Sequence, residues 1–323
     1  MKEPMRSMNE INAIEVEHLE KGYRGVPVLH DVSFKVRRGT VFALLGANGS
    51  GKTTTINILT TLIRGDGGTA SVAGFDVATQ PARVREVISV TGQSAAVDYI
   101  LTGRENLVLM GELRHVDDPQ GVASSLLDKF DLNDAADRRL LTYSGGMRRR
   151  LDIAMSLVGE APIIFFDEPT TGLDPQSRTD MWQTIQELAG RGSTIFLTTQ
   201  YLEEADRLAD EIAILHGGRV VAGGTPEELK TMVPTGLVEL DFTEDEEAAA
   251  AQRALDDGHE LSLVDSKLVV ASDGSVADMA DLFIRLDNAG LAPTGFTVKE
   301  PTLDDVFFKI LGEDKEEAHA NAH

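Results

Sequence analysis

The sequence predicts an α/β fold built on a mostly parallel sheet, followed by a small α+β unit. Three observations support this prediction. Short β-rich runs alternate with longer helical runs from Ala13 to about Thr198, a glycine-rich loop joins one of these runs directly to a helix, and the pattern changes after Gly217-Gly218. With 323 residues, the chain has room for about two domains of roughly 150 residues each.

Seven strands are expected in the first part of the chain, over residues 14–19, 32–36, 41–45, 87–91, 163–166, 194–197 and 212–215. Between the fourth and the fifth strand, residues 102–160 carry apolar side chains at helical spacing, for example Leu107, Met110 and Leu113. This segment is expected to be a helical insertion. We therefore expect a first domain over residues 13–233 that includes a helical subdomain.

The second part begins after Val233-Pro234-Thr235-Gly236, which breaks the preceding pattern. The order strand, helix, strand, strand, helix, strand is typical of a ferredoxin-like unit. An amphipathic helix containing Leu303 and Val306 closes the unit, and the polar tail 313–323 is expected to be disordered. The expected elements of this domain, residues 237–312, are 237–242, 245–257, 261–264, 268–271, 276–289 and 295–299.

Composition excludes several classes of function. The 53 acidic side chains outnumber the 30 basic ones, which argues against a nucleic-acid partner held by phosphate neutralisation. The absence of cysteine excludes disulfides, thiolate metal sites and thiol nucleophiles. No run of about 18 apolar residues occurs. We expect a chain that does not cross a membrane by itself but can sit against one.

A phosphate-binding loop is the strongest chemical signal. Residues 46–53 match the pattern G-x-x-x-x-G-K-[ST] at every fixed position, between an apolar strand and a helix. Backbone N–H groups in such a loop converge on anionic oxygens. Lys52 would reach the β- and γ-phosphates of a nucleotide, and the Thr53 hydroxyl would be a ligand of Mg²⁺.

A second site element follows the apolar strand at residues 163–166. Asp167 ends this strand at the sheet edge where a further Mg²⁺ ligand is expected. The next residue, Glu168, is a candidate general base for an attacking water. Because Pro169 disfavours helix at the residue before it, we expect Glu168 to be extended.

The run Tyr143-Ser144-Gly145-Gly146-Met147-Arg148 resembles the signature sequence of ATP-binding cassette (ABC) proteins. This resemblance implies a P-loop NTPase fold of the ABC type, with ATP and Mg²⁺ as ligands. It also implies a head-to-tail dimer, in which the signature of one chain contacts the γ-phosphate held by the other. The ATP-binding residues that it implies in this sequence are Tyr23, Gly46, Ala47, Asn48, Gly49, Ser50, Gly51, Lys52, Thr53, Thr54, Ser144, Gly145, Gly146 and Asp174.

Other positions fall into register with the same family. Tyr23 resembles the aromatic residue that stacks on adenine, and Asp174 lies in a run similar to the loop that crosses the dimer interface. Gln93 resembles the glutamine that meets Mg²⁺ and the lytic water. The catalytic residues are then Glu168, Gln200 and Gln93, and the Mg²⁺ ligands are Thr53, Gln93 and Asp167.

Two positions depart from the family pattern. Met147 replaces the usual glutamine of the signature, and Gln200 stands where most members have histidine. Glutamine donates a hydrogen bond but does not titrate. We therefore expect turnover to depend less on pH near neutrality than in relatives with histidine. A third feature, the run Arg148-Arg149-Arg150, is interpreted as a solvated helix face.

The runs at residues 142–154, 198–206 and 301–307 are similar to the ATPase subunits of the daunorubicin and doxorubicin resistance subfamily. The resemblance covers residues 13–312 and implies an ATPase subunit that powers export of a drug-like or lipophilic compound. Its partners would be a separate integral membrane permease, which contacts Gln93 to Leu101, and a second ATPase subunit in a homodimer. The expected location is the cytoplasmic face of the membrane.

Two alternatives remain open at this point. A soluble cassette ATPase that acts on ribosomes or DNA is one of them, although such proteins usually carry two cassettes or coiled-coil arms and favour basic patches. The other, compatible with the exporter, makes residues 237–312 a regulatory ligand-binding module.

Overall fold

The computed structural model describes residues 12–92, 97–159, 161–233, 236–256, 261–264, 266–272, 275–299, 301–307 and 309–310. The chain divides into two compact units, Met1–Pro226 and Glu227–His323. The tail 313–323, expected to be disordered, lies outside the described residues, as does Gln93.

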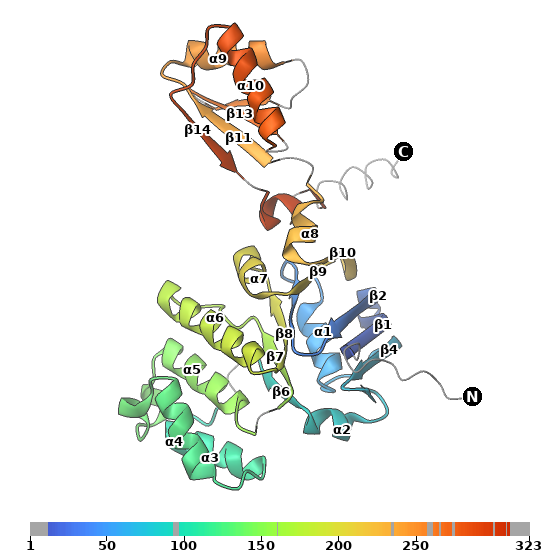
Figure 1. The fold of residues 1–323 in the computed structure, drawn as a ribbon. Coiled ribbons are helices and arrows are strands. Elements are labelled where there is room, and N and C mark those ends of the chain that lie inside the picture. The colour runs from blue at the N-terminus through green and yellow to red at the C-terminus, as the bar shows by residue number, and fades with distance from the viewer. Residues whose placement is uncertain are drawn as a thin grey trace, which may run out of the picture. The chain divides into compact units, whose positions relative to one another are not determined.

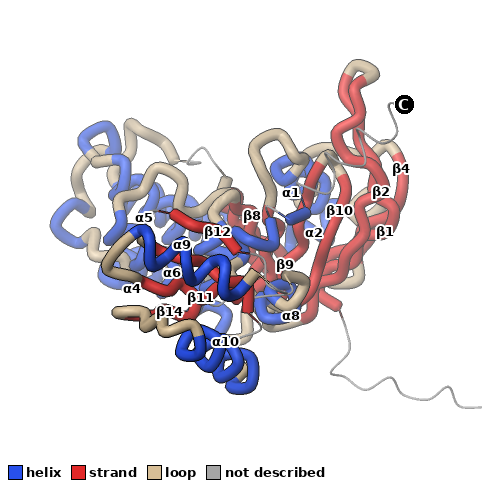
Figure 2. The backbone as a smooth tube through the Cα atoms, turned by 90° about the horizontal axis from the view of Figure 1, so that it is seen from above, coloured by secondary structure: helices blue, strands red, loops and turns tan. Residues whose placement is uncertain are grey.

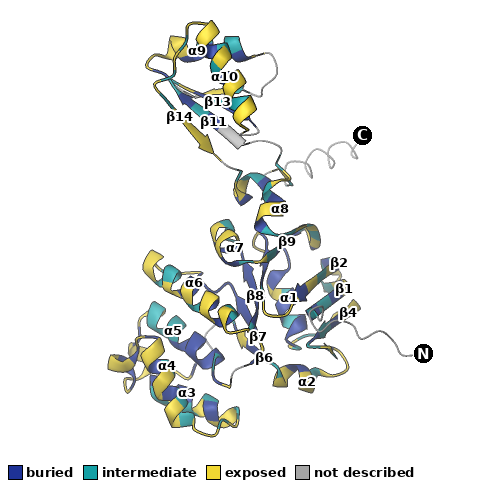
Figure 3. Ribbon diagram, viewed as in Figure 1, coloured by how far each residue is buried: buried dark blue, intermediate teal, exposed yellow. Residues whose placement is uncertain are grey.

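A six-stranded sheet is the centre of the first unit (Figure 1). Five of its strands are parallel, and the last one pairs antiparallel with its neighbour. Every residue of β3 (Val41–Leu45), β7 (Ile163–Asp167) and β8 (Thr194–Thr199) is buried. Figure 3 shows β7 and β8 in the colour of buried residues. The strands in order across the sheet are β10 (Arg219–Gly224), β9 (Glu211–His216), β3 (Val41–Leu45), β8 (Thr194–Thr199), β7 (Ile163–Asp167) and β6 (Ile88–Thr91).

A second, antiparallel sheet is formed by β2 (Val26–Arg37), β1 (Asn12–Tyr23), β4 (Gly67–Val72) and β5 (Phe75–Asp76), in that order. The expectation that the first two strands belong to one mostly parallel sheet is therefore wrong. Arg24 and Gly25 have φ values of 51° and 82° and close a tight hairpin, which forces β1 and β2 to pair antiparallel, side by side in Figures 1 and 2. Strands β4 and β5 had not been predicted.

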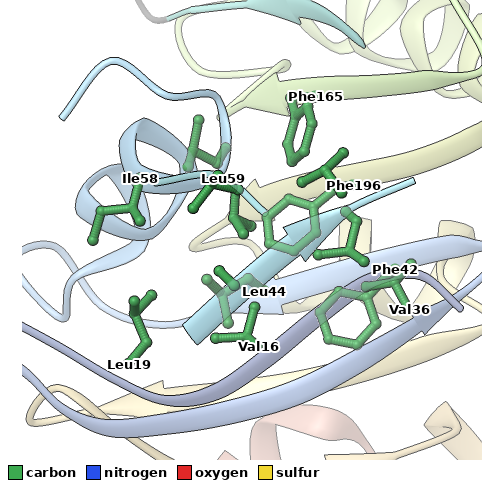
Figure 4. Close-up of a cluster of buried hydrophobic side chains, with 14 of the residues drawn as sticks. Val16, Leu19, Val36, Phe42, Leu44, Ile58, Leu59, Phe165 and Phe196 are labelled. Carbon is green, nitrogen blue, oxygen red and sulfur yellow. The ribbon is translucent and has the colours of Figure 1, made fainter. Parts of the chain in front are cut away.

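One hydrophobic core joins the two sheets to helix α1 (Lys52–Leu59). Figure 4 shows Val16, Leu44 and Leu59 pointing into this core from β1, β3 and α1. Stacked rings extend it, because the centroids of Phe42 and Phe196 lie 5.5 Å apart. The phosphate-loop helix is thus fixed against both sheets.

Residues between β6 and β7 form helices α3 (Gly103–Leu113), α4 (Pro119–Lys129) and α5 (Gly145–Ser156), with short 3₁₀ turns at 133–135 and 140–142. Capping residues fix where these helices begin. The Thr102 side chain caps α3 in a capping box with Glu105, and Ser144 caps α5. The remaining helices of the first unit are α2 (Pro81–Glu86), α6 (Pro175–Gly190) and α7 (Leu202–Leu208).

The three successive arginines of α5 do not share one environment. The side chain of Arg149 is only 11% exposed. The interpretation of this run as a solvated face is therefore wrong for Arg149. Helical periodicity turns the middle residue of the three toward the core, where backbone carbonyls accept its hydrogen bonds.

The second unit begins with α8 (Pro226–Lys230) and contains β11 (Gly236–Asp241), α9 (Asp245–Leu255), β12 (Leu261–Val264), β13 (Lys267–Ser272), α10 (Val276–Asn288) and β14 (Gly295–Lys299). Its sheet has the order β12-β13-β11-β14 with antiparallel pairs throughout. Strand β13 lies between the two strands that α9 connects, which is the split arrangement of a ferredoxin-like unit. Val238, Leu240 and Leu268 pack in its core.

Candidate nucleotide site

The phosphate loop lies between β3 and α1, as its pattern predicts. Gly49 and Gly51 have φ values of 82° and 113°, which only glycine adopts readily. A Cβ atom at position 51 would lie 2.5 Å from Leu29 Cδ2, and one at position 46 would lie 2.4 Å from the Leu215 carbonyl oxygen. The loop therefore depends on glycine both for its turns and for its close packing. Ala47, Asn48 and Gly49 face solvent.

The Lys52 ammonium is held inside this loop. Its side chain is 4% exposed, and Nζ donates to the carbonyl oxygens of Gly46, at 2.7 Å, and Ala47, at 3.1 Å. The same Nζ lies 3.3 Å from Glu168 Oε1. A buried ammonium needs such partners to offset its desolvation. The loop thus places a positive charge where phosphate oxygens would enter.

Asp167 lies at the carboxyl end of β7, next to Thr198 on the parallel strand β8. The Thr198 hydroxyl donates to Asp167 Oδ1 at 2.6 Å. The Thr53 hydroxyl approaches the same oxygen at 3.4 Å. Strands β3 and β7 lie on either side of β8, and the loop after β3 brings Thr53 to the carboxyl end of β7. A hydroxyl with a carboxylate is a donor set that suits Mg²⁺. Thr54 follows in α1 and is half-buried.

Glu168 is not extended, contrary to the expectation from Pro169. Its φ is 51°, in the left-handed region. Proline excludes the right-handed helical conformation before it, and the turn is fixed instead by the backbone N–H of Glu168, which donates to the Thr198 carbonyl and hydroxyl, each at 3.1 Å. The Thr171 hydroxyl donates to Glu168 Oε2 at 3.2 Å. The carboxylate is thereby directed at Lys52.

We call Lys52, Thr53, Asp167 and Glu168 the strand-end cluster. Gln200 follows β8 and is half-buried. Strand β8 is the neighbour of β7, which ends at Asp167. Gly92, the last described residue before Gln93, follows β6 at the same edge of the sheet. The carboxyl edge of β3, β8, β7 and β6 therefore collects the predicted chemistry on neighbouring loops.

Tyr23 ends β1 and is 46% exposed. The Lys21 ammonium lies 5.5 Å from the centre of its ring. The hairpin touches the phosphate loop through Leu29 and borders a hollow of about 480 Å³. The residues that line this hollow are Glu20, Lys21, Gly22, Gly25, Pro27, Leu29, His30, Asp31, Asp66 and Arg219.

The signature residues form a separate group. Ser144 Oγ accepts from the Met147 N–H at 3.2 Å and caps α5, while Ser144 and Gly145 remain exposed. Asp174 caps α6: its carboxylate accepts from the Ser177 N–H at 3.0 Å and the Ser177 hydroxyl at 2.7 Å. The backbone hydrogen bond from Ser177 lowers the pKa of Asp174, and its side-chain hydrogen bond adds to this effect.

We call Ser144, Gly145, Gly146 and Asp174 the helix-start cluster. A Cβ atom at Gly146 would lie 3.6 Å from Ser177 Oγ, so the first turns of α5 and α6 are neighbours. Within the described part of the chain, no hydrogen bond or ion pair joins this cluster to the phosphate loop. The structure therefore places the predicted site residues in two clusters.

Sequence reasoning missed the groups that support these clusters. Thr198 positions both Asp167 and Glu168, and a threonine at the end of a neighbouring parallel strand is the only signal that pointed to it. Glu204 on α7 is fully buried, and Trp182 Nε1 donates to its Oε1 at 3.2 Å. Burial raises the pKa of Glu204. The Arg207 guanidinium lies 4.9 Å from the centre of the Trp182 ring.

No helix in the described ranges combines the length and the apolar character that a membrane crossing requires. Tyr99 and Ile100, which follow β6 in the chain, are 41% and 69% exposed, whereas Val97 is buried. Val97 therefore packs inside the unit, whereas Tyr99 and Ile100 face outward.

Comparisons with known proteins show which family this chain resembles. The family described as "ABC transporter" matches residues 29–171. The daunorubicin resistance ATP-binding protein DrrA2 of Streptomyces coeruleorubidus is 42% identical over 314 residues, which cover 95% of this chain and 98% of that protein. The doxorubicin resistance ATP-binding protein DrrA of Mycobacterium tuberculosis is 42% identical over 316 residues and covers 94% of each chain.

A solved structure described as the ATP-binding subunit of an ABC transporter superposes with a TM-score of 0.63 at 32% identity, over 68% of this chain and 92% of that one. The resistance protein DrrA2 matches 95% of this chain, so the similarity extends beyond the share that the solved structure covers. The chain therefore belongs to the ABC transporter family, as an ATP-hydrolysing subunit of the daunorubicin and doxorubicin resistance subfamily.

Proposed function

We propose that the strand-end cluster binds and hydrolyses MgATP to power export through a separate membrane permease. The convergence of Lys52 Nζ, Thr53 Oγ1, Asp167 and Glu168 at one sheet edge is the observation that carries this proposal. Lys52 would exchange its carbonyl partners for β- and γ-phosphate oxygens. The loop residues 46–54 would supply further donors, and Tyr23 would stack on the adenine beside the hollow of the hairpin.

Thr53 and Asp167 would hold Mg²⁺ with the nucleotide, and the family pattern adds Gln93. The bound ion would neutralise charge on the phosphates. Thr53 Oγ1 and Asp167 Oδ1 lie 3.4 Å apart, and adjacent ligands at about 2.0–2.1 Å from an octahedral ion lie about 3 Å apart, so a small approach of the two oxygens would suit Mg²⁺. Thr198 fixes the orientation of Asp167.

Glu168 is the proposed general base. It accepts a proton from water as the water oxygen bonds to the γ-phosphorus, and the bond from that phosphorus to the bridging oxygen of ADP breaks. ADP and inorganic phosphate are the products. Lys52 and Thr171 orient the Glu168 carboxylate before the reaction. Gln200 would donate a hydrogen bond to the γ-phosphate without changing its charge.

The helix-start cluster would complete the site of a second copy of this chain. Ser144, Gly145 and Gly146 present backbone donors at the positive end of α5, where an anion is favourable. Asp174 would lie at the same interface. Two chains would then enclose two ATP molecules, and nucleotide would favour the closed homodimer over the open form.

The permease would contact the apolar residues Tyr99 and Ile100. That contact would hold the chain at the cytoplasmic face of the membrane. The names of the related proteins support a drug-like or lipophilic substrate, and the charge of −23 supports the exporter over a ribosome- or DNA-bound ATPase. We assign residues 13–233 to the ATPase domain, 102–160 to its helical subdomain and 237–312 to an accessory domain.

The Glu168→Gln substitution tests the chemistry. We expect unchanged ATP affinity, loss of nearly all hydrolysis, and a dimer that persists in ATP during size-exclusion chromatography. The exposed Glu203 provides the matched control, because Glu203→Gln removes the same charge near the site and should leave all three properties unchanged. Wild-type turnover in Glu168→Gln would remove Glu168 from the role of base.

Capture of the chain from detergent-solubilised membranes tests the partner. A polytopic membrane protein should copurify in stoichiometric amount, and its recovery should fall in a Tyr99→Glu, Ile100→Glu variant that still binds ATP. Recovery with ribosomes or DNA, from the soluble fraction only, would contradict the exporter assignment while leaving the ATPase chemistry intact.

A further inference from the structure

Arg149 connects helix α5 to the loops that carry the catalytic residues. Its Nη1 donates to the Gly92 carbonyl oxygen at 2.7 Å, and its Nε donates to the Pro169 carbonyl oxygen at 3.0 Å. A longer contact of 3.4 Å joins Nη2 to the Glu168 carbonyl oxygen. One guanidinium thus spans the ends of β6 and β7.

This side chain is buried at a cost that its contacts must offset. It is 11% exposed, and Asp152 Oδ2 lies 3.4 Å from Nη1. Burial lowers the pKa of Arg149, against the opposing effect of Asp152. The planar guanidinium presents several donors in a fixed fork, which a lysine ammonium cannot reproduce. The position therefore requires the shape of arginine as well as its charge.

The two neighbouring arginines make different contacts. Arg148 Nε donates to the Tyr143 carbonyl oxygen, just before the signature. Arg150 Nη1 donates to the Phe130 carbonyl oxygen at the end of α4. Both contacts stay within the helical segment, whereas Arg149 reaches the strand ends. Arg150 is thus a matched reference for Arg149 in the same helix.

The turn that Arg149 holds is the one that aims the general base. Glu168 has a φ of 51°, a conformation that a non-glycine residue keeps only when its surroundings impose it. Arg149 contacts the carbonyl oxygens of Glu168 and Pro169, whereas the Glu168 N–H donates to Thr198. The turn is therefore held from both of its ends.

We infer that Arg149 is a positioning residue for hydrolysis: its guanidinium fixes the Glu168 turn to helix α5, so that seating of Ser144 on the partner's nucleotide sets the geometry of Glu168 in the same chain. The inference rests on the proposed function. Ser144 and Arg149 lie on one rigid helix, about 7.5 Å apart along its axis at 1.5 Å per residue. Engagement of the helix start is thereby transmitted to the base.

The test compares Arg149→Lys with Arg150→Lys in the full chain. For Arg149→Lys we expect kcat to fall at least about tenfold, which corresponds to roughly 1.4 kcal/mol in the barrier. The KM and Kd for ATP should be unchanged, even where loss of the guanidinium contacts lowers the Tm. Arg150→Lys should match the wild type. An unchanged kcat in Arg149→Lys would overturn the inference, and so would a parallel loss of Tm, ATP affinity and kcat, because that result indicates a purely structural role.

A double-mutant cycle tests the transmission itself. If Arg149 carries the effect of Ser144 to Glu168, Ser144→Ala should reduce kcat much less in the Arg149→Lys background than in the wild type. The cycle of Ser144→Ala with Arg150→Lys should be additive. Additivity in both cycles would overturn the inference, whereas hydrolysis by Glu168→Gln would instead overturn the proposed function.

Discussion

The strand-end cluster and the helix-start cluster differ in what their own chain supplies. Lys52, Asp167 and Glu168 are buried, and each has hydrogen-bond or ion-pair partners within the first unit. Ser144 and Gly145 are exposed, and the Ser144 hydroxyl accepts the Met147 N–H that begins helix α5. Both are anion sites by the same physics of helix N-termini, but one is enclosed and the other is open.

In the proposed dimer, this difference would explain why one chain supplies half of a site. A buried cluster can hold its charges in fixed positions because carbonyls and hydroxyls offset their desolvation. An exposed helix start is hydrated, and its donors become strong only when a partner excludes water. Association of two chains would supply that exclusion.

The largest expected effect is from a charge added to the helix-start cluster. No atom lies within 4 Å of a Cβ at Gly145, so Gly145→Asp should fold, with an acidic side chain in the first turn of α5 that favours the helix. Repulsion of the γ-phosphate should reduce dimer-dependent hydrolysis by about 100-fold or more. Equilibrium binding of ATP to the single chain should be unchanged.

Gly145→Ala is the control for that experiment, because it adds a Cβ without a charge. If Gly145→Asp weakened ATP binding to the isolated chain as strongly as it slowed hydrolysis, the two clusters would belong to one site within a single chain.

The complementary change is in the strand-end cluster. Lys52→Ala should weaken ATP binding to the single chain by about 10- to 150-fold, because hydrogen bonds to charged groups contribute about 1.5–3 kcal/mol. Calorimetric titration with a non-hydrolysable ATP analogue would measure this loss. Lys129→Ala, on helix α4, removes an ammonium that pairs with Glu187 and should bind normally. Unchanged ATP affinity in Lys52→Ala would mean that the loop at residues 46–53 does not bind the phosphates of ATP through this lysine.

A smaller effect is expected at Gln200, which follows β8. Wild-type kcat should be nearly independent of pH between about pH 6 and 8, since glutamine does not titrate. Gln200→His should introduce an inflection near about pH 6.5, the ordinary pKa of histidine. A wild-type inflection there that disappears in Gln200→Asn would contradict this assignment.

The smallest expected effect concerns the pH dependence of folding stability at Glu204, on helix α7. The pKa of Glu204 is raised by burial, so the folded chain binds this proton more tightly than the unfolded chain does. Stability contributed by protonated Glu204 is present below its unfolded pKa of about 4.5 and is lost as pH rises through the folded pKa. Glu204→Gln should remove this loss, and its Tm advantage over the wild type should grow as pH rises.

Asp174 in the helix-start cluster contrasts with Glu204, because hydrogen bonds lower the pKa of Asp174. Its contribution is present at neutral pH and is lost as pH falls below the ordinary range of aspartate, so Asp174→Asn should differ most from the wild type at neutral pH. A Glu204→Gln variant whose Tm followed the wild type at every pH would show that Glu204 is already ionised in the folded chain.

Short sequence patterns predicted the strand-end cluster well. The spacing of residues 46–53 and the carboxylates after β7 are properties of short runs of sequence, and the parallel sheet brings their ends together. The left-handed turn at Glu168 and the burial of Arg149 depend on contacts between segments far apart in the chain. The antiparallel pairing of β1 and β2 likewise depends on a turn whose conformation the strand pattern does not reveal.

The chain contains a single tryptophan, Trp182. Trp182 is on α6, which begins at Asp174, and it contacts Glu204 and Arg207 on α7, which follows Gln200. Its indole fluorescence therefore has one source, in contact with a carboxyl group and a guanidinium that belong to the other helix. The native chain thus contains its own optical probe of any displacement of α6 against α7 during turnover, without a label or an added chromophore.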